Sequence, residues 1–150
     1  MLYLSKSKYL LGLQCPKLLW TAYNRKTELP PPEQMAEFVM AEGRKVGAVA
    51  QRLYPGGLKI EREQDPVKMH AKSLAAAASR QPLFEAGFIF GQTYALADIL
   101  VPVEEDKWDL IEVKSATQIK PEYQEDIAFQ KYVYQGAGLK IRRCYIMFLN

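Results

Sequence analysis

Charged residues interrupt two otherwise apolar stretches of this chain. Asp98 lies within Ala95–Val101, and Glu112 and Lys114 lie within Trp108–Ser115. Burying such charges costs free energy unless they pair with an opposite charge or bind a metal ion. Hard cations such as Mg²⁺ prefer oxygen ligands and often sit beside phosphates, and a nearby lysine can orient a water or offset developing negative charge. The three residues are therefore candidates for metal-assisted chemistry on a phosphate ester.

The same three residues could instead form a structural ion pair without a metal. On a strand, Glu112 and Lys114 share one face, while Ile111 and Val113 share the other. A lysine on the same face as the glutamate could neutralise it directly, and a Glu-x-Lys triplet alone occurs often by chance. The neighbouring elements therefore have to distinguish a metal site from an ion pair.

A helix beginning at Pro121 would carry a glutamine on its apolar side. The apolar stripe of that helix consists of Tyr123, Ile127, Val133, Tyr134 and Ala137. Gln130 falls in the middle of this stripe, and a buried amide needs a hydrogen-bond partner. A polar site on the sheet would supply one, with Tyr134 one turn further along the same side. The alternative is a glutamine satisfied by the backbone.

A hairpin turn would bring Glu85 opposite Asp98. With Gly91-Gln92 as a two-residue turn, Phe90 pairs with Thr93, and the register places position 85 opposite position 98. Two opposed carboxylates repel each other unless a cation lies between them or one is protonated. Glu85 is thus either a further metal ligand or a solvent-facing residue of the first hairpin strand.

The order of the predicted elements indicates an α/β domain with a mixed sheet. Strands are expected at 58–61, 83–90, 93–101, 108–115 and 140–149, and helices at about 33–53, 65–79 and 121–136 or 138. Before them, Ser5 or Ser7 can cap a short helix that Gly12 breaks and Pro16 restarts. Pro30-Pro31-Pro32 then forms a stiff connector.

The composition is that of one globular domain. The 150 residues are 49% hydrophobic and 25% charged, and no apolar run is long enough to span a membrane. The net charge of +3 fits a nucleic-acid partner as well as an ordinary solvated surface, and basic residues such as Lys6 and Lys8 gather locally. Two cysteines are too few for a zinc site or a disulfide framework, so a cytoplasmic protein is expected.

The motifs together resemble those of the PD-(D/E)xK nuclease superfamily. Asp98, thirteen residues and then Glu112-Val113-Lys114, followed by a helix with Gln130-x-x-x-Tyr134, resembles the RecB-like branch. The segments Leu4-Ser5-Lys6-Ser7 and Gln14-Cys15-Pro16-Lys17 are similar to uncharacterised bacterial RecB-like nucleases and to CRISPR-associated RecB-like exonucleases. This resemblance covers nearly the whole chain.

The resemblance implies a restriction-endonuclease-like core, in which helices flank a mixed central sheet. Residues 1–150 would be a single RecB-like nuclease domain, with an N-terminal helical segment at about 5–32 and the core at about 33–150. Because the chain stops at or just after an apolar strand, we expect a fragment of a longer protein with further domains. The implied activity is that of an (exo)deoxyribonuclease that uses Mg²⁺ or Mn²⁺ and acts on DNA, single- or double-stranded, with exonuclease and endonuclease action both open.

The resemblance also assigns roles by position. Asp98 and Glu112 would ligate the metal, with the carbonyl of Val113 completing the set, and Lys114 would position the nucleophilic water. Gln130 and Tyr134 would contact the DNA backbone or order the site.

Two departures from the family pattern concern metals. RecB-like nucleases often carry a metal-binding histidine on the long helix, where this chain has Gly47; Glu42 or Glu85 could substitute, and His70 is interpreted as a surface residue. Some relatives hold an iron–sulfur cluster with four cysteines, of which only Cys15 has a counterpart here, so we expect no such cluster within this chain and a core-packing role for that thiol.

Two further hypotheses remain beside a nuclease. A degenerate domain could bind nucleic acid without cutting it, because the histidine is missing. Alternatively, the charged residues could be purely structural, in a module that serves as a scaffold within a larger protein.

Overall fold

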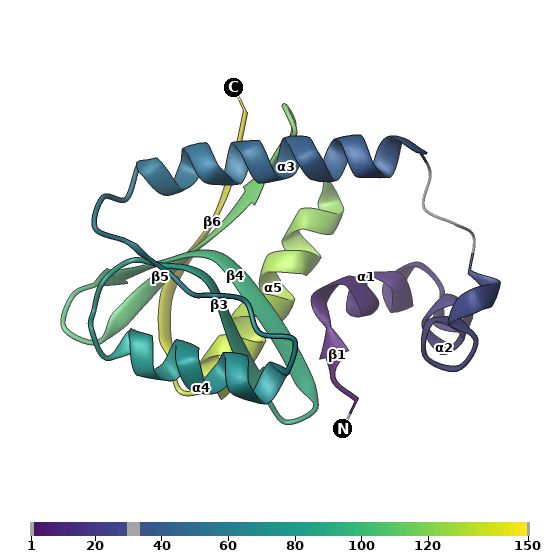
Figure 1. Ribbon diagram of the computed structural model, residues 1–150, viewed down its shortest axis with the longest axis horizontal. Helices are drawn as coiled ribbons and strands as arrows, with labels where there is room; N and C mark the ends of the chain where they lie inside the picture. The colour runs from purple at the N-terminus through teal and green to yellow at the C-terminus, as the bar shows by residue number, and fades with distance from the viewer. Residues whose placement is uncertain (1, 30–33, 150) are drawn as a thin grey trace.

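The computed structural model describes residues 2–29 and 34–149 (Figure 1). Its helices are α1 (Lys6–Gln14), α2 (Pro16–Asn24), α3 (Gln34–Arg52), α4 (Pro66–Ala77) and α5 (Pro121–Gly136), with a 3₁₀ turn η1 (Lys26–Glu28). Its strands are β1 (Leu4–Ser5), β2 (Leu58–Lys59), β3 (Leu83–Phe90), β4 (Thr93–Val103), β5 (Lys107–Lys114) and β6 (Lys140–Phe148). The expected connector Pro30-Pro31-Pro32 lies outside the described residues.

The six strands form one mixed, open sheet. The strand order is β2-β3-β4-β5-β6, and β1 pairs with β4. β3, β4 and β5 are antiparallel neighbours, whereas the pairs β1–β4, β2–β3 and β5–β6 are parallel. Parallel neighbours need a crossover, and α5 provides it between β5 and β6. The expected α/β class, with a mixed central sheet flanked by helices, is confirmed.

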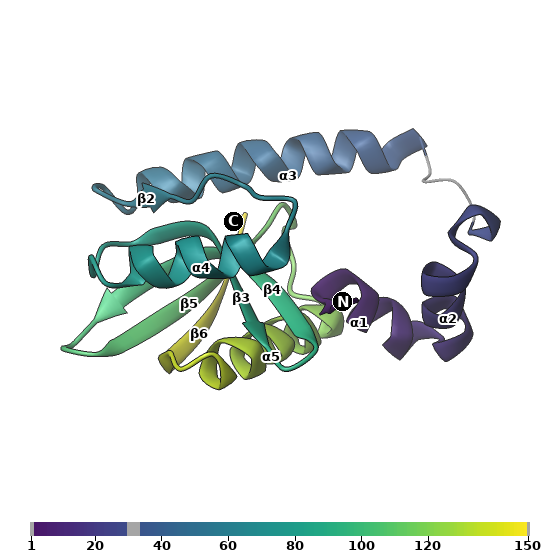
Figure 2. The same cartoon turned by 60° about the horizontal axis from the view of Figure 1, so that its bottom comes forward.

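Two apolar clusters hold the helices against opposite faces of the sheet. The larger cluster joins the sheet to α4 and α5 through fully buried side chains such as Met69, Phe88 and Val133. The smaller joins it to α3 through Ala50, Phe84, Ile99 and Ile111. Burying a large apolar side chain stabilises the fold by roughly 1.5–3 kcal/mol, so the larger cluster dominates. Figure 2 shows α3 and α5 on opposite sides of the sheet.

The N-terminal helices differ from expectation at Gly12. This glycine does not break the first helix: α1 continues through it to Gln14, and the chain leaves the helix at Cys15. A Cβ atom at Gly12 would lie 2.9 Å from Cδ2 of Leu19, so the glycine permits close packing of α1 against α2. Pro16 begins α2, as its position predicted.

The strands β4 and β5 separate at one end of their ladder. Their pairing runs from Val103↔Lys107 to Ile99↔Ile111 and stops there, although β5 continues to pair with β6 as far as Lys114↔Phe148. The freed edge of β4 pairs instead with β1, at Thr93 and Tyr94. This short N-terminal strand was not predicted. The separation leaves Asp98 and Glu112 beyond the last β4–β5 pair.

Side chains of α4 accept hydrogen bonds from backbone N–H groups on the open edge of β3. β2 pairs with β3 only at Leu83 and Phe84, which leaves the later N–H groups of that edge without a neighbouring strand. The Gly87 N–H donates to Oγ of Ser73 (2.8 Å), and the Ile89 N–H donates to Nδ1 of His70 (3.2 Å). His70 is thus half-buried and holds a strand edge, which corrects its interpretation as a surface residue. Covering an edge in this way blocks pairing with other chains.

Replacing Ser73 should expose the importance of this edge contact. Ser73→Ala leaves the buried N–H of Gly87 without its acceptor, so the free energy of unfolding should fall by about 1–3 kcal/mol. Urea unfolding followed by circular dichroism measures it. Ser79→Ala, at an exposed serine two residues after the same helix ends, is the control and should change stability by less than about 0.5 kcal/mol. Equal effects of the two substitutions would show that the Gly87 contact contributes little.

Candidate functional site

Two buried carboxylates and two lysines meet beside the point where β4 and β5 separate. Nζ of Lys114 lies 2.7 Å from Oε1 of Glu112 and 2.5 Å from Oδ2 of Asp126. Nζ of Lys6 lies 2.7 Å from the same Glu112 oxygen and 3.3 Å from Oδ1 of Asp126. Glu112 and Asp126 are 2% and 1% exposed, so water contributes little to their solvation. We call these four residues the charge cluster.

A glutamine of α5 donates hydrogen bonds to both carboxylates of the charge cluster. Nε2 of Gln130 donates to Oε2 of Glu112 (2.6 Å) and to Oδ1 of Asp126 (2.9 Å). The hydroxyl of Tyr134 donates in turn to Oε1 of Gln130 (3.0 Å), and both side chains are fully buried. The amide N–H groups of Gln130 therefore donate to site carboxylates rather than to the backbone. Tyr134 reaches the carboxylates only through this amide.

Glu112 stays ionised in its buried position. Burial by itself would raise the pKa of this carboxyl, but the ammonium groups of Lys6 and Lys114 outweigh it and hold the pKa at about 2. The same contacts raise the pKa of Lys114 against the opposing effect of its own burial. Glu112 and Lys114 therefore keep their charges throughout the physiological pH range.

Asp98 lies in a different electrostatic setting from Glu112. Its Oδ2 accepts a hydrogen bond from the N–H of Val113 (2.8 Å), which lies beyond the last β4–β5 pair. Burial, together with the negative charge of Glu112, raises the pKa of Asp98 to about 7, although Lys6 opposes the shift. The charge of Asp98 therefore changes near neutral pH.

Glu85 has the predicted register but not the predicted neighbours. β3 and β4 pair as expected, from Phe90↔Thr93 through Ala86↔Ala97, so position 85 is level with position 98. The backbone of Glu85 has a φ of +58°, in the left-handed region, and its Oε1 lies 2.9 Å from Nζ of Lys59. Among the side chains that the structure describes, those of residues 2–29 and 40–149, no three Asp, Glu, His or Cys side chains are grouped closely enough to hold a metal. The expected gathering of Glu85, Asp98 and Glu112 around one point is therefore not present.

A groove of about 520 Å³ runs between α3 and the sheet and reaches the site. Asp98, Glu112 and Val113 line its floor, with Gly43 and Gly47 on the helix above. Three basic residues also line it: Arg44, Lys59 and Arg62. A Cβ atom at Gly47 would meet nothing within 4 Å, so the groove has room for a side chain at the position where the family resemblance places a histidine.

Glu42, the other possible substitute for that histidine, does not line the groove. Its Oε1 accepts a hydrogen bond from Nζ of Lys45 (2.7 Å) on the same helix. Both side chains are on the part of α3 that the structure describes. Glu42 therefore has a lysine partner and no contact with Asp98 or Glu112.

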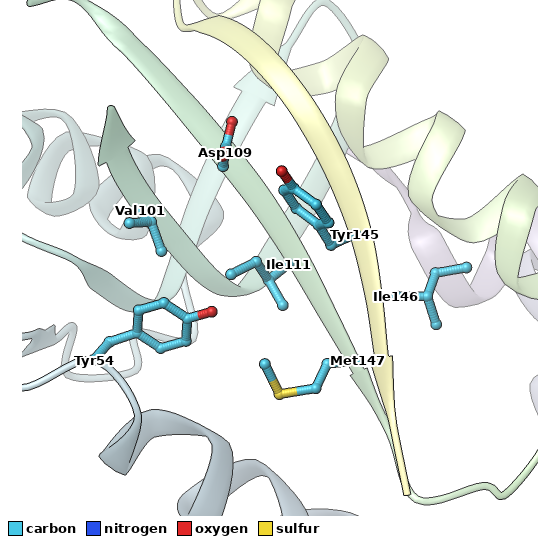
Figure 3. A pocket seen from close by; sticks show the side chains of 7 residues that line it. All are labelled: Tyr54, Val101, Asp109, Ile111, Tyr145, Ile146 and Met147. Atoms are coloured by element: carbon cyan, nitrogen blue, oxygen red, sulfur yellow. The ribbon is translucent and has the colours of Figure 1, made fainter. Parts of the chain in front are cut away.

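A second cavity, of about 430 Å³, lies on the same face of the sheet near the end of α3 (Figure 3). It is mainly apolar, with Tyr54 and Tyr145 on its wall and no predicted site residue. Its one carboxylate, Asp109, accepts two hydrogen bonds from Arg142, at 3.0 and 2.6 Å. The cavity thus offers no unpaired charge for chemistry.

The sequence analysis did not identify two members of the charge cluster. Asp126 had a local signal, because Asp126, Gln130 and Tyr134 are spaced by four residues and so share one side of α5. Lys6 had none, since its contact with Glu112 spans 106 positions and depends on β1 pairing with β4.

Cys15 and Cys144 carry free thiols and are half-buried. Cys144 packs against the larger apolar cluster, whereas Cys15 lies at the junction of α1 and α2 and belongs to neither cluster, contrary to its expected core-packing role. None of the helices in residues 2–29 and 34–149 combines the length and apolar character needed to cross a membrane. No family model, curated protein or solved structure matches the chain. The RecB-like assignment and the roles it implies therefore stay predictions.

The raised pKa of Asp98 predicts a pH-dependent stability of the metal-free protein. The folded pKa of about 7 lies above the unfolded value of about 3.9, so the native state binds this proton more tightly. The free energy of unfolding should therefore fall as pH rises from about 4 to about 7, by at most about 1.4 kcal/mol per pH unit.

Asp98→Asn isolates this contribution, since the amide cannot ionise but can still accept from Val113. Urea unfolding of both proteins with EDTA, at several pH values between 4 and 8, measures the difference. We expect the variant to gain stability over the wild type as pH rises. Parallel stability curves would rule out a raised Asp98 pKa.

Proposed function

We propose that this domain hydrolyses phosphodiester bonds of DNA with the help of Mg²⁺ or Mn²⁺. The observation that carries the proposal is the placement of Asp98, Glu112 and Lys114. They lie together where β4 and β5 separate, and residues Asp98 and Glu112 line a groove that basic residues also line. An ordinary structural ion pair needs neither a groove nor a second half-buried carboxylate. A restriction-endonuclease-like core is part of the same proposal.

The residues present fit a hard divalent cation. Asp98 and Glu112 supply carboxylate oxygens, and Val113 supplies a carbonyl, which are the ligand types that Mg²⁺ and Mn²⁺ take. Burial and the nearby charge of Glu112 raise the pKa of Asp98, and a cation bound beside it would favour its ionised form. Such an ion would act as a Lewis acid on the phosphate and lower the pKa of a bound water. Few protein ligands imply weak binding without DNA, because substrate oxygens would complete the shell.

The remaining side chains have separate roles in this proposal. Lys114 would position the nucleophilic water and offset negative charge on the phosphate. Its contacts with Glu112 and Asp126 fix the position of its ammonium group. Gln130 orients the Glu112 carboxylate, and Tyr134 orients Gln130. These two act through other residues and need not touch DNA.

The basic residues of the groove suit a nucleic-acid backbone. Arg44, Lys59 and Arg62 line the space that also reaches Asp98 and Glu112. Lys59 is already paired with Glu85, so the two arginines are the stronger candidates for phosphate contacts. Binding through phosphates should weaken steeply as salt concentration rises.

A second candidate function is nucleic-acid binding without cleavage. It is favoured by Gly47 and by the absence of any three-ligand metal group among the described residues. Cleavage assays on single- and double-stranded DNA, with Mg²⁺, Mn²⁺ or EDTA, separate it from a nuclease. Salt-dependent DNA affinity without cleavage would identify a binding domain, and neither activity would favour a structural module.

Lys114→Ala and Glu112→Gln should each lower the rate of metal-dependent DNA cleavage by at least about 10²-fold. Each removes a charge beside the proposed metal position, and rate losses of this size follow the removal of one stabilising group. Lys131→Ala, an exposed lysine on α5, is the control and should cut normally. Circular dichroism melts distinguish lost chemistry from unfolding. Cleavage by Lys114→Ala at the wild-type rate would refute the assigned mechanism.

Gly47→His should tighten metal binding. The groove has room at this position, and an imidazole would add one ligand to those of Asp98 and Glu112. We expect the Mn²⁺ dissociation constant to fall at least about tenfold, equivalent to about 1.4 kcal/mol, in calorimetric titration. Val49→His places the imidazole at an exposed position of α3 outside the groove and should leave the affinity unchanged. Equal affinities of the two variants would place the ion elsewhere.

A further inference from the structure

Lys6 reaches the charge cluster from the far end of the chain. The N–H of Leu4 donates to the carbonyl of Gln92 (2.8 Å), and β1 then pairs with the start of β4, so α1 begins beside the site. Tyr9, one turn later, stacks on Phe129 of α5 with ring centroids 4.6 Å apart. Figures 1 and 2 both show α1 next to α5. The position of the Lys6 ammonium is thus set by specific pairing and packing.

Lys6 and Lys114 share one oxygen of the central carboxylate. Oε1 of Glu112 accepts from both ammonium groups at 2.7 Å, and Oε2 accepts from Gln130 at 2.6 Å. A carboxylate oxygen has two lone pairs, so Oε1 is fully engaged. A divalent ion at this oxygen would have to replace one of the two lysines, and an ion at Oε2 would still meet the charge of Lys6 close by.

Lys6 is the lysine better placed to leave. Its side chain is 27% exposed against 19% for Lys114, and its distance to Asp126 is 3.3 Å against 2.5 Å. Lys114 belongs to β5, which pairs with β6 along its whole length. By contrast, none of the nine residues of α1 is buried. β1 holds this segment through only two residues. Moving Lys6 therefore disturbs much less of the fold.

We propose that the ammonium of Lys6 is a resident counter-ion of Glu112 that competes with the divalent metal, so that the β1–α1 segment controls metal occupancy of the site. With no metal present, Lys6 helps to neutralise two buried carboxylates. When a metal binds, the lysine withdraws toward solvent and leaves the Glu112 oxygen to the ion. This inference rests on the proposed function, because it concerns the metal of that reaction.

Mn²⁺ titration of the purified chain tests the competition without DNA. Free Mn²⁺ is measured by its electron paramagnetic resonance signal at constant pH and ionic strength. Lys6→Met removes the competing charge and should lower the Mn²⁺ dissociation constant at least about tenfold, given the strength of charge interactions at 3–4 Å in a partly buried site. Lys6→Arg keeps the charge and should bind Mn²⁺ no more tightly than the wild type.

Lys8→Met is the matched control on the same helix. The Lys8 ammonium lies over the ring of Tyr23, 3.8 Å from its centroid, rather than in the charge cluster, so its loss should leave the affinity unchanged. Thermal melts in EDTA and in Mn²⁺ report folding, and Mn²⁺ should raise the melting temperature of Lys6→Met more than that of the wild type. If Lys6→Met folds only with Mn²⁺, that dependence itself supports the counter-ion role.

The outcomes separate this inference from the proposed function. Equal or weaker Mn²⁺ binding by Lys6→Met, in a protein whose wild type cuts DNA with Mn²⁺, overturns the inference and leaves the function standing. Tighter binding by both Lys6→Met and Lys8→Met also overturns it, since any loss of positive charge would then suffice. No Mn²⁺ binding by any variant at millimolar concentration overturns the inference, whereas the proposed function is overturned by the absence of metal-dependent DNA cleavage.

Discussion

The burial of one ionised carboxylate organises this domain. Glu112 is 2% exposed, and an ionised group so far from water needs opposite charges and hydrogen bonds to be stable. Its partners come from three elements: Lys6 from α1, Lys114 from β5 and Gln130 from α5. Helix packing on this side of the sheet therefore has to satisfy an electrostatic requirement as well as an apolar one. Every buried side-chain nitrogen and oxygen among the described residues has a partner, so the requirement is met.

The separation of β4 from β5 supplies the second constraint. It gives Asp98 a backbone N–H to accept from and opens the sheet toward the groove below α3. On the neighbouring strand, Glu85 adopts a left-handed backbone, which costs an L-residue roughly 1–2 kcal/mol. Strand alternation shifts there by one residue, since Leu83 and Ala86 belong to the same apolar cluster. Backbone strain of this kind is often found beside functional sites.

Charge balance explains why the two acids behave differently. The charge cluster contains two ammonium groups and two carboxylates, so Glu112 is compensated and its pKa falls to about 2. Asp98 is the additional negative charge, and its pKa rises to about 7. The charges of the cluster balance without a metal ion. A divalent ion could still bind if one of the two lysines moved away from Glu112, and the same residues would then serve both the stability of the fold and the reaction.

Local spacing in the sequence determined most elements of this protein and the register of the β3–β4 hairpin. The Gly91-Gln92 turn set the β3–β4 pairing, and alternation put Glu112 and Lys114 on one strand face, because backbone geometry within one element depends only on nearby residues. Tertiary structure alone decided which charges meet. Lys6 reaches Glu112 across 106 positions, and Glu85 pairs with Lys59, because long-range packing and the end of the β4–β5 ladder decide those partners.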